Sequence, residues 1–212
     1  MDVKRGRHGE RSRREQNTEA TRGALLRVAR DFFTRYGYDG AKTEQIVRRA
    51  RVTRGALYHH FRGKKDLFRE VVEQLEGELV GKVASVAIGR ADIWATAVAS
   101  LRAFLDACME PAVQRIVLLD APSVLGYDTW REIDERYGIA LIRSMLEEAM
   151  AQGVIHRQPV DALAHVMLGA LNEGALLIAR SNDPRRERRE VEESLRRLME
   201  GLRTAPSGDP PA

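Results

Sequence analysis

Apolar residues along the chain recur every three or four positions, which is the spacing of amphipathic helices. The first clear example runs from about Thr18 to Tyr36. Gly37 then offers the left-handed conformation that ends many helices, and Tyr38 is placed to fold back onto the helix end. No alternating run with turn signals predicts a sheet, so we expect an all-α chain of about nine helices. The remaining predicted helices cover residues 43–50, 53–60, 64–85, 92–109, 111–120, 128–152 and 160–180, and a last helix runs from after Pro184 to about residue 202.

The two ends of the chain lack this periodicity. Residues 1–16 are charged and carry few large apolar side chains, and residues 204–212 are rich in proline, so both segments are expected to be disordered. The basic N-terminus is not followed by the apolar stretch of a secretion signal. No apolar run approaches the roughly 20 residues of a membrane helix. The single cysteine, Cys108, excludes an internal disulfide, so we expect an intracellular protein with no membrane partner.

Charge is distributed unevenly along the 212 residues. The formal net charge is only +4, yet residues 1–65 hold 18 Lys and Arg against 7 Asp and Glu, a net charge of +11. Residues 66–212 hold 17 against 24, a net charge of −7. The basic segment favours a polyanionic partner such as DNA, because neutralising phosphates releases condensed counterions.

Two short helices flank a turn inside this basic segment. The turn is expected at Arg51 and Val52, and the Thr53 hydroxyl is placed to accept a backbone N–H at the start of the second helix. Leu57 and Phe61 are expected in the core. Two short helices at a tight turn, preceded by a long helix, are what a helix-turn-helix DNA-binding unit requires.

The residues from Thr21 to Phe68 indicate the function more specifically than the net charge does. Their sequence, TRGALLRVARDFFTRYGYDGAKTEQIVRRARVTRGALYHHFRGKKDLF, strongly resembles the N-terminal domain of the tetracycline-repressor (TetR) family of bacterial transcriptional regulators. The rest of the chain resembles that family only in its helical architecture. The matching positions are Leu25, Leu26, Ala29, Phe32, Phe33, Gly37, Tyr38, Thr43, Ile46, Ala50, Val52 to Phe61, Lys64 and Leu67.

The resemblance implies an N-terminal three-helix domain with a helix-turn-helix, followed by a helical domain for ligand binding and dimerisation. It also implies a location in the bacterial cytoplasm, with association to the nucleoid through DNA. The expected divisions are a disordered basic arm at 1–16, a DNA-binding domain at 17–63, an effector-binding and dimerisation domain at 64–203, and a disordered tail at 204–212.

Carried over by position, the resemblance makes residues 43–50 the positioning helix and residues 53–60 the recognition helix. Arg54 is the expected reader of a base edge, because a guanidinium can bridge the O6 and N7 acceptors of guanine. Other positions match groove-facing or phosphate-binding residues of the family. The full predicted set of DNA contacts is Lys42, Thr43, Thr53, Arg54, Ala56, Tyr58, His59, His60 and Lys64.

Two places depart from the family pattern. Arg51 stands where the turn usually carries glycine, so either the turn tolerates a non-glycine residue or its geometry differs. Ala41 and Lys42 replace the Thr or Ser that usually precedes the second helix, and Thr43 is the expected substitute cap.

Simpler interpretations stay open for several of these residues. Tyr58 could be partly core. His59 and His60 point about 100° apart on a helix, so they cannot share an ion, and no metal site is expected. Three arginines are either solvated or steer the DNA backbone: Arg48, Arg49 and Arg51.

The last two long helices are expected to dimerise. Small residues among large apolar ones allow close helix packing, and the family forms its dimer interface from these two helices of each subunit. The alternative is that their apolar stripes are only intramolecular core. The predicted interface residues are Met167, Ala170, Leu171, Gly174, Leu195, Leu198 and Leu202.

An effector cavity is also implied by the resemblance, with mostly apolar walls and a few polar groups. Residues of these types are more often core than pocket lining, so the core stays open as the alternative for each of them. The predicted lining is Trp94, Phe104, Cys108, Tyr127, Trp130, Tyr137, Met145 and Asn172.

These patterns predict a sequence-specific DNA-binding regulator. We expect a homodimeric repressor that binds a near-palindromic double-stranded DNA operator and is released by an unidentified small, largely apolar effector, without a cofactor. The alternative is a DNA-binding dimer without an effector, which is architectural or controlled by a protein partner. An enzyme is disfavoured, because the sequence offers no metal-spaced His/Glu pattern, no phosphate-binding glycine loop and no partner for Cys108.

Overall fold

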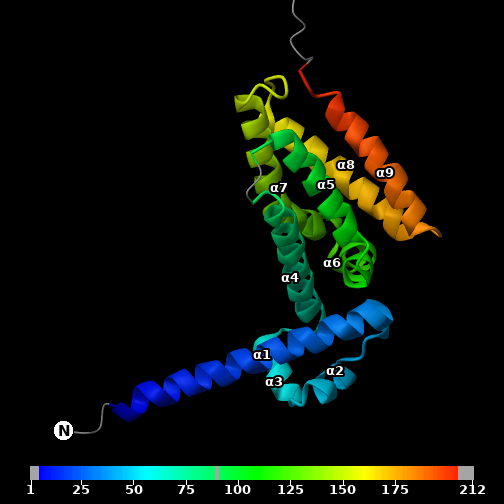
Figure 1. Ribbon diagram of the computed structural model, residues 1–212. Helices are drawn as coiled ribbons and strands as arrows, with labels where there is room; N and C mark the ends of the chain where they lie inside the picture. Colours follow the sequence, from blue (N-terminus) through cyan, green and yellow to red (C-terminus); the bar gives the residue numbers. More distant parts are fainter. Residues whose placement is uncertain (1–4, 89–90, 205–212) are drawn as a thin grey trace, which may run out of the picture. The chain divides into compact units, whose positions relative to one another are not determined.

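The computed structural model describes residues 5–88 and 91–204. These residues form nine α-helices and one π-helical segment, so the all-α prediction is confirmed (Figure 1). In chain order the elements are α1 (Arg5–Gly40), α2 (Thr43–Ala50), α3 (Arg54–His60), α4 (Lys64–Ser85), α5 (Ile93–Cys108), η1 (Val113–Asp120), α6 (Ala121–Leu125), α7 (Tyr127–Ala151), α8 (Val160–Arg180) and α9 (Pro184–Glu200).

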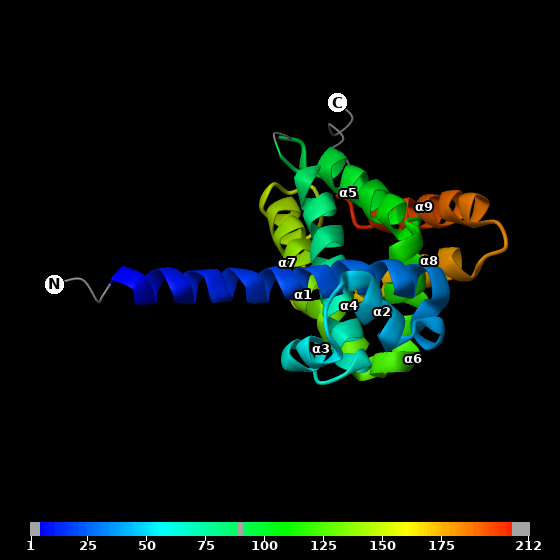
Figure 2. The ribbon, with the colours of Figure 1, turned by 90° about the horizontal axis from the view of Figure 1, so that it is seen from below.

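The long helix α1 has α2 and α3 packed against its C-terminal half (Figure 1, Figure 2). Gly37 interrupts its helical geometry with a φ of 66° and a ψ of 176°, a backbone conformation that favours glycine. The next residue folds back as expected, because the ring of Tyr38 stacks on Phe33 with centroids 6.0 Å apart. The interruption predicted at Gly37 is therefore present.

The two ends of the chain were both expected to be disordered. Helix α1 already begins at Arg5, so this expectation is wrong for residues 5–16. That stretch contains no proline, and its Arg, Glu and Gln residues are good helix formers. At the other end, the Thr204 hydroxyl donates to the carbonyl of Gly153 at 2.8 Å. Residues 205–212 of the predicted tail lie outside the described residues.

The N-terminal unit ends after Glu73, and its core includes the first half of α4. Phe33 and Phe68 meet edge to face with ring centroids 5.0 Å apart. Because α4 contributes to this core, the compact unit extends beyond residue 63. Its buried apolar side chains are Leu25, Leu26, Ala29, Phe33, Ala41, Ile46, Val47, Leu57, Phe61, Leu67, Phe68, Val71 and Val72.

Helix α4 supplies side chains to two cores. It runs from Lys64 to Ser85, the range that its apolar stripe predicts. Val71 is buried in the N-terminal unit, whereas Leu75 and Leu79 are buried in the C-terminal unit. The chain therefore passes from one core to the other within this helix.

The C-terminal unit begins at Gln74 and is a helical bundle in which α8 packs against α5, α7, α9 and η1. Two of its helices, α5 and α9, have side-chain caps at their starts. The Asp92 carboxylate accepts the Trp94 N–H at 2.8 Å before α5, and the Asp183 carboxylate accepts the Arg186 N–H at 3.1 Å before α9. One core cluster joins α5, α8 and α9 through Leu101, Leu105, Ile178, Val191 and Leu195.

The segment before α7 differs from its prediction, which ended one helix at residue 120 and began the next at residue 128. Instead η1 passes directly into α6, and Pro122 lies in the first turn of α6. Proline has no N–H to donate, so the continuous helical path lacks one backbone hydrogen bond at Pro122. The helical path ends at Gly126, whose φ is 94°.

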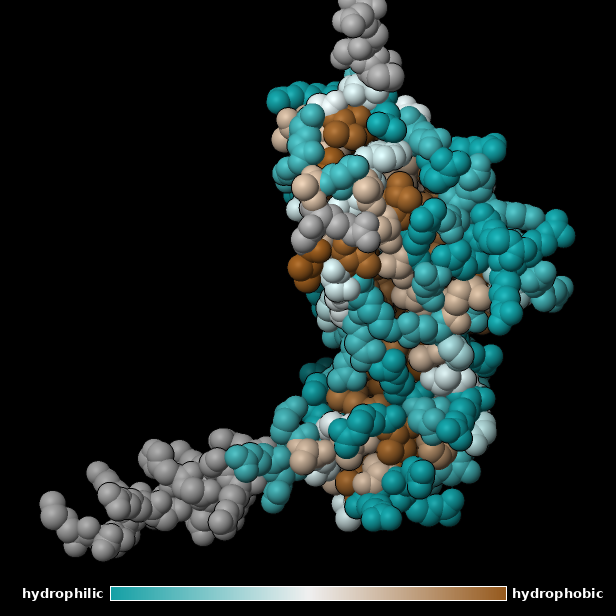
Figure 3. Space-filling model, viewed as in Figure 1, coloured by the Kyte–Doolittle hydropathy of each residue, from teal (hydrophilic) through white to brown (hydrophobic). Residues whose placement is uncertain are grey.

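Helix α8 is the one helix of the described residues that is long and apolar enough to cross a membrane. One such helix is weak support for a membrane span, and core helices pass the same test. Here the apolar side has internal partners, because Ala164, Leu168, Ala175 and Ile178 are buried in the bundle. The surface around α9 is strongly hydrophilic in the view of Figure 3.

Candidate nucleic-acid interface and internal cavity

A capped turn positions α3, the candidate recognition helix. Thr53 precedes it, and the Thr53 hydroxyl accepts the Ala56 N–H at 3.1 Å, so the predicted cap is confirmed. Arg51 has a φ of 57° and a ψ of 39°, and it is the only described non-glycine residue with a positive φ. The turn therefore keeps the left-handed geometry despite lacking glycine, at a cost of about 1–2 kcal/mol.

The start of α2 is less regular than that of α3. Lys42 occupies the N-cap position, and no side chain caps the helix. The expectation that Thr43 substitutes as the cap is wrong, because Thr43 is the first helical residue. Ala41 is fully buried and donates its N–H to the carbonyl of Gly37 at 3.2 Å, so packing and a backbone bond fix this entry instead.

Helix α3 turns one side inward and one side outward. Leu57 is fully buried, as predicted. Ala56 and His60 are half-buried at the two edges, so Ala56 lies farther from the outward side than the sequence suggested. The outward side is formed by Arg54, Gly55, Tyr58 and His59.

Gly55 is the residue of this outward side that the sequence reasoning missed. A Cβ at Gly55 would meet only the Thr53 hydroxyl, 3.8 Å away. Bare backbone is therefore open to a closely approaching partner. The available signal was its position one residue after Arg54, on the same exposed arc of a helix whose core residue is Leu57.

Arg54 is held only by surface contacts. Its guanidinium carbon lies 5.6 Å from the ring centroid of Tyr58, and its Nη1 lies 3.7 Å from Oε1 of Glu44. The side chains of Arg54 and Glu44 are 66% and 67% exposed, so water screens this pair and its contribution is small. Arg54 also lines a groove of about 280 Å³ together with Thr43, so these two predicted contacts lie together. The guanidinium can exchange its present partners for a base edge at little cost.

Lys64 and His60 differ in the charge that they can offer a phosphate. The Lys64 ammonium lies 4.3 Å above the ring centroid of Tyr38, and burial lowers its pKa from the ordinary lysine value. Burial also lowers the pKa of His60, and the charges of His59 and Arg22 act in the same direction. At neutral pH, His60 therefore offers an N–H donor, whereas Lys64 remains cationic.

A basic hollow of about 570 Å³ lies beside α2. Four of its lining residues are basic and none is acidic, so it suits a phosphate better than any neutral partner. The lower part of this unit is mostly hydrophilic in Figure 3. The lining residues are Phe32, Tyr36, Gly40, Lys42, Gln45, Arg48, Arg49 and Arg51.

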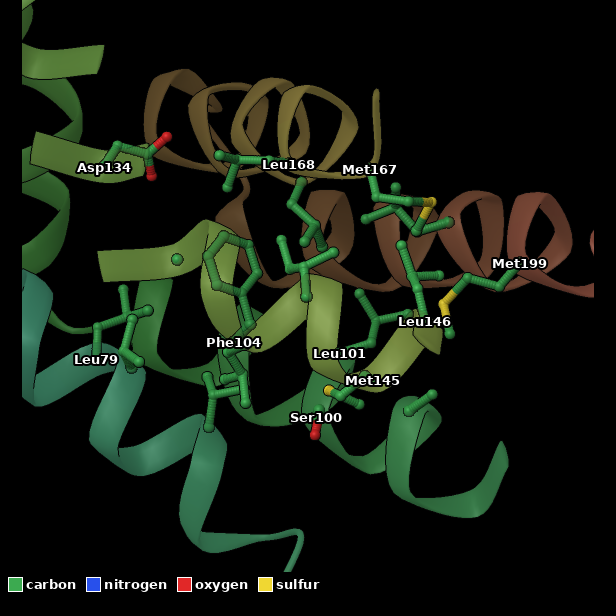
Figure 4. Close-up of a pocket in the computed structure, with 18 of the residues that line it drawn as sticks. Leu79, Ser100, Leu101, Phe104, Asp134, Met145, Leu146, Met167, Leu168 and Met199 are labelled. Carbon is green, nitrogen blue, oxygen red and sulfur yellow. The ribbon is translucent and has the colours of Figure 1, made fainter. Parts of the chain in front are cut away.

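The C-terminal unit contains a cavity of about 130 Å³ among α4, α5, α7, α8 and α9 (Figure 4). Its walls are almost entirely leucine, methionine, valine and other apolar residues. In Figure 4, Asp134 lies at one end of the labelled residues, and Met167 and Met199 lie toward the other. The polar residues of the lining are Glu76, Ser100 and Asp134, and the lining includes no Lys, Arg or His.

Two carboxyl groups give this cavity its chemistry. Glu76 is 5% exposed and has no hydrogen bond or ion pair among the described residues, and burial raises its pKa to about 8, with the charge of Asp134 adding to the effect. Asp134 accepts a hydrogen bond from Nδ2 of Asn172 at 2.6 Å. Burial raises the pKa of Asp134 to about 6, although Asn172 and Arg131 act in the opposite direction. The Ser100 hydroxyl is buried without a partner.

The predicted lining residues separate into three groups. Phe104 and Met145 line the cavity. Asn172 does not line it but holds Asp134, which does. The prediction fails for the others, because they have packing partners elsewhere or face solvent: Trp94, Cys108, Tyr127, Trp130 and Tyr137.

Four of these five residues have a specific contact elsewhere, and the fifth, Cys108, is fully buried. Arg203 lies over the ring of Trp94 at 4.8 Å, and Tyr127, 62% exposed, packs on Trp130 at 5.6 Å between centroids. Cys108 is fully buried, which raises the pKa of its thiol. The Tyr137 ring covers Gly77, 3.5 Å from the position of a Cβ there.

The sequence contained a signal for both cavity acids, although the predicted lining was chosen mainly from large aromatic residues and included neither acid. Glu76 falls on the apolar stripe of α4, between Val72 and Val83, and Asp134 falls on the stripe of α7 beside Ile133. An acid at a core position of an amphipathic helix must be buried, so it marks an internal polar site.

The predicted dimer residues also fall into different environments: some are buried within the subunit, some line the cavity and some are exposed. Gly174 and Leu195 are buried within the subunit, because a Cβ at Gly174 would lie only 2.7 Å from Cγ1 of Val191. Met167 and Leu171 line the cavity, and Ala170 packs against the α5/α8/α9 cluster. Leu202 is half-buried. Leu198, which was also predicted, is exposed on α9. Val166 and Leu177 of α8 are exposed as well, although neither was in the predicted set.

Comparisons with known families and proteins agree on one assignment. The model described as "Bacterial regulatory proteins, tetR family" matches residues 25–71. The model described as "Tetracyclin repressor-like, C-terminal domain" matches residues 94–202, just over half of the chain. The chain belongs to the TetR family.

Individual relatives of this TetR-family protein cover both units. A solved TetR-family transcriptional regulator from Pectobacterium atrosepticum is 34% identical and has a TM-score of 0.81, with 90% of this chain and 98% of that one covered. The Tn10 TetC protein of Escherichia coli is 20% identical over 75% of this chain and 80% of its own length. The regulator AcrR of Shigella flexneri is 38% identical over 31% of this chain and 30% of its own length.

This TetR-family protein is a DNA-binding transcriptional regulator and not an enzyme, because its family and its structural neighbours are regulators. The resemblance inferred from residues 21–68 is thereby confirmed. Family members typically act as dimers that respond to small molecules.

Proposed function

We propose that this TetR-family protein is a cytoplasmic repressor that binds a near-palindromic operator as a homodimer and releases it when a small, largely apolar effector occupies the C-terminal cavity. In this proposal residues 17–63 contact the operator. Residues 64–203 hold the effector and the second subunit. The proposal rests on three surfaces with different chemistry: the outward side of α3, the exposed stripe of α8, and the cavity.

The outward side of α3 is the observation that carries the DNA contact. Arg54 and Tyr58 are exposed there beside the backbone of Gly55, and the basic hollow beside α2 supplies cations for flanking phosphates. Base edges are read by such donors, whereas phosphate contacts fix the register. Thr53 contributes by capping α3, because its hydroxyl already accepts a backbone N–H.

The exposed stripe of α8 supports the dimer. Val166 and Leu177 are 67% and 48% exposed, and they lie three turns apart on the same side of the helix. Gly169 lies between them on that side, with nothing within 4 Å of an added Cβ. A bare backbone between two exposed apolar side chains suits the close approach of a second helix.

The cavity supports release by an effector. Helix α4 lines the cavity through Glu76, Leu79 and Val83, and its first half belongs to the core of the DNA-binding unit. An effector that prefers a different position of α4 therefore changes the affinity of the dimer for its operator. By thermodynamic linkage, bound operator weakens the binding of the effector by the same factor. The coupling free energy between two such sites is typically 1 to 3 kcal/mol.

Selection of genomic DNA fragments by the purified protein tests the proposal. The expected result is enrichment of one inverted repeat whose half-sites are about one helical turn apart or somewhat more. Enrichment without an inverted repeat would contradict the homodimer, and no enrichment above bulk DNA would contradict sequence-specific binding.

The second candidate is a DNA-binding dimer that needs no effector. A thermal-shift screen of small molecules with the same protein separates the two. Failure of every compound class to raise the melting temperature counts against the effector, whereas the operator result would stand.

A further inference from the structure

The cavity contains an ionisable group without a partner. Glu76 is almost completely buried, lines the cavity, and makes no hydrogen bond or ion pair among the described residues. A buried carboxyl group without a partner costs stability in either protonation state. A ligand that brings a donor or a positive charge to Glu76 removes that cost.

The sign of the missing charge follows from the rest of the lining. Asp134 is the second acid, and no basic side chain lines the cavity. The nearby Arg131 is already engaged, because its Nε donates to Oε1 of Glu135 at 2.8 Å. An anionic effector would have two carboxyl groups and no cation to meet, so the cavity selects against it.

The size and shape of the cavity limit the ligand further. A volume of about 130 Å³ is close to that of an engineered cavity of about 150 Å³ that holds benzene. Three methionines, Met145, Met167 and Met199, line it, and their side chains repack easily around ligands of different length. Met167 and Met199 lie toward the end opposite Asp134 in Figure 4. An apolar group therefore fits toward the methionines and a polar head toward the acids.

We infer that the effector is a compact lipophilic amine whose protonated nitrogen is held by the carboxylates of Glu76 and Asp134 and whose apolar part lies against the methionine end. This inference rests on the proposed effector function and names its ligand class. The ammonium group arrives with its proton, and Glu76 releases its own proton to the solvent, so the complex contains an ammonium ion between carboxylates. The elevated pKa of Glu76 means that a proton is there to be released at neutral pH.

Calorimetric titration of the full-length protein with three ligands of matched shape tests the inference. Phenethylamine, phenethyl alcohol and phenylacetate share a ring and a chain but differ in the charge of the head group. We expect the amine to bind roughly tenfold or more tightly than the alcohol, because a charge-assisted hydrogen bond is about twice as strong as a neutral one and a buried ion pair adds to it. Phenylacetate should bind most weakly. Equal affinities, or tightest binding of phenylacetate, would overturn the inference.

Substitutions of the two cavity acids, with a control on α4, locate the contact. Glu76→Gln should weaken the binding of the amine by roughly tenfold and change the affinity for the alcohol by no more than about twofold. Glu78→Gln is the matched control, because Glu78 is exposed on α4 and does not line the cavity, so it should change neither ligand. Asp134→Asn provides a second variant with the same expectation as Glu76→Gln. Amine affinity that survives both cavity substitutions would overturn the assignment.

Operator binding is measured separately, so that the two proposals fail differently. Amine binding that depends on Glu76 but does not change the affinity for DNA supports the ligand class and contradicts release by an effector. Release of DNA by a neutral or anionic compound, with no binding of the amine, contradicts the ligand class and leaves the repressor function intact.

Discussion

The two units display their functional groups in opposite ways. On α3, Arg54 is exposed and carries only weak surface contacts with Tyr58 and Glu44. In the cavity, Glu76 and Asp134 are buried, and the pKa values of both are raised. A charge in water costs the fold almost nothing and remains available to DNA. A charge inside an apolar bundle lowers stability until a ligand supplies its partner.

Two glycines of α8 show a similar contrast, because one has open space beside it and the other is packed against a side chain. Their substitution has the largest expected effects. Gly174→Leu should destabilise the C-terminal unit by about 3 kcal/mol or more, because a Cβ would lie 2.7 Å from Cγ1 of Val191. Gly169→Leu should leave the subunit folded, since nothing lies within 4 Å of an added Cβ. If α8 forms the dimer, this variant should become monomeric and lose on the order of 100-fold in operator affinity.

Sedimentation and denaturation curves distinguish the two glycine variants. Gly81→Leu is the control for Gly169→Leu, because Gly81 also lies inside a helix with open space around it. We expect it to remain dimeric. A dimeric Gly169→Leu variant would place the interface elsewhere.

The pH dependence of stability tests the buried half of the comparison. The pKa of Glu76 is about 8 in the folded state against an ordinary value of 4.5, so the folded state holds more protons between these values. Stability should therefore fall as pH rises from about 5 to about 8, by on the order of a few kcal/mol. The neighbouring Asp134 contributes at lower pH, because its folded pKa is about 6, and the buried thiol of Cys108 stays protonated throughout.

Denaturant titrations of wild type and Glu76→Gln at several pH values check this expectation. Glutamine does not ionise, so the variant should lose much less stability than wild type across that range. The Gln variant should also be the more stable protein at alkaline pH, where the wild-type carboxylate is charged. Parallel stability curves would show that Glu76 is solvated in the folded state.

The same contrast explains how much could be predicted from the sequence. The bounds of α2 and α4, the Thr53 cap and the core position of Leu57 followed from local spacing, because each depends on residues a few positions apart. The cavity depends on five helices that are distant in sequence, so the choice of large aromatic residues as its lining selected core positions such as Trp130. Helical periodicity shows that a residue faces inward, but not whether space remains beside it.

A smaller and more specific effect is expected on the exposed half of the comparison. Arg54→Ala should reduce the preference for the best operator over single-base variants by roughly tenfold at the position that Arg54 reads. The protein should stay fully folded, because the side chain is 66% exposed. Arg35→Ala removes the same charge from an exposed site on α1, and it should leave the base preference unchanged. Unaltered preference in Arg54→Ala would contradict the assignment of α3 as the reading helix.

The smallest expected effect belongs to Lys64, which combines features of both regions because it is half-buried yet cationic. Lys64→Ala should weaken binding to all DNA sequences by a similar factor and reduce the slope of affinity against salt by about one unit, since one phosphate contact is lost. Lys82→Ala is the control, because Lys82 pairs with Glu110 in the C-terminal unit and should not change the salt slope. A Lys64→Ala slope equal to that of wild type would mean that the ammonium group stays over the Tyr38 ring when DNA binds, and that its role is to hold the start of α4 rather than to contact a phosphate.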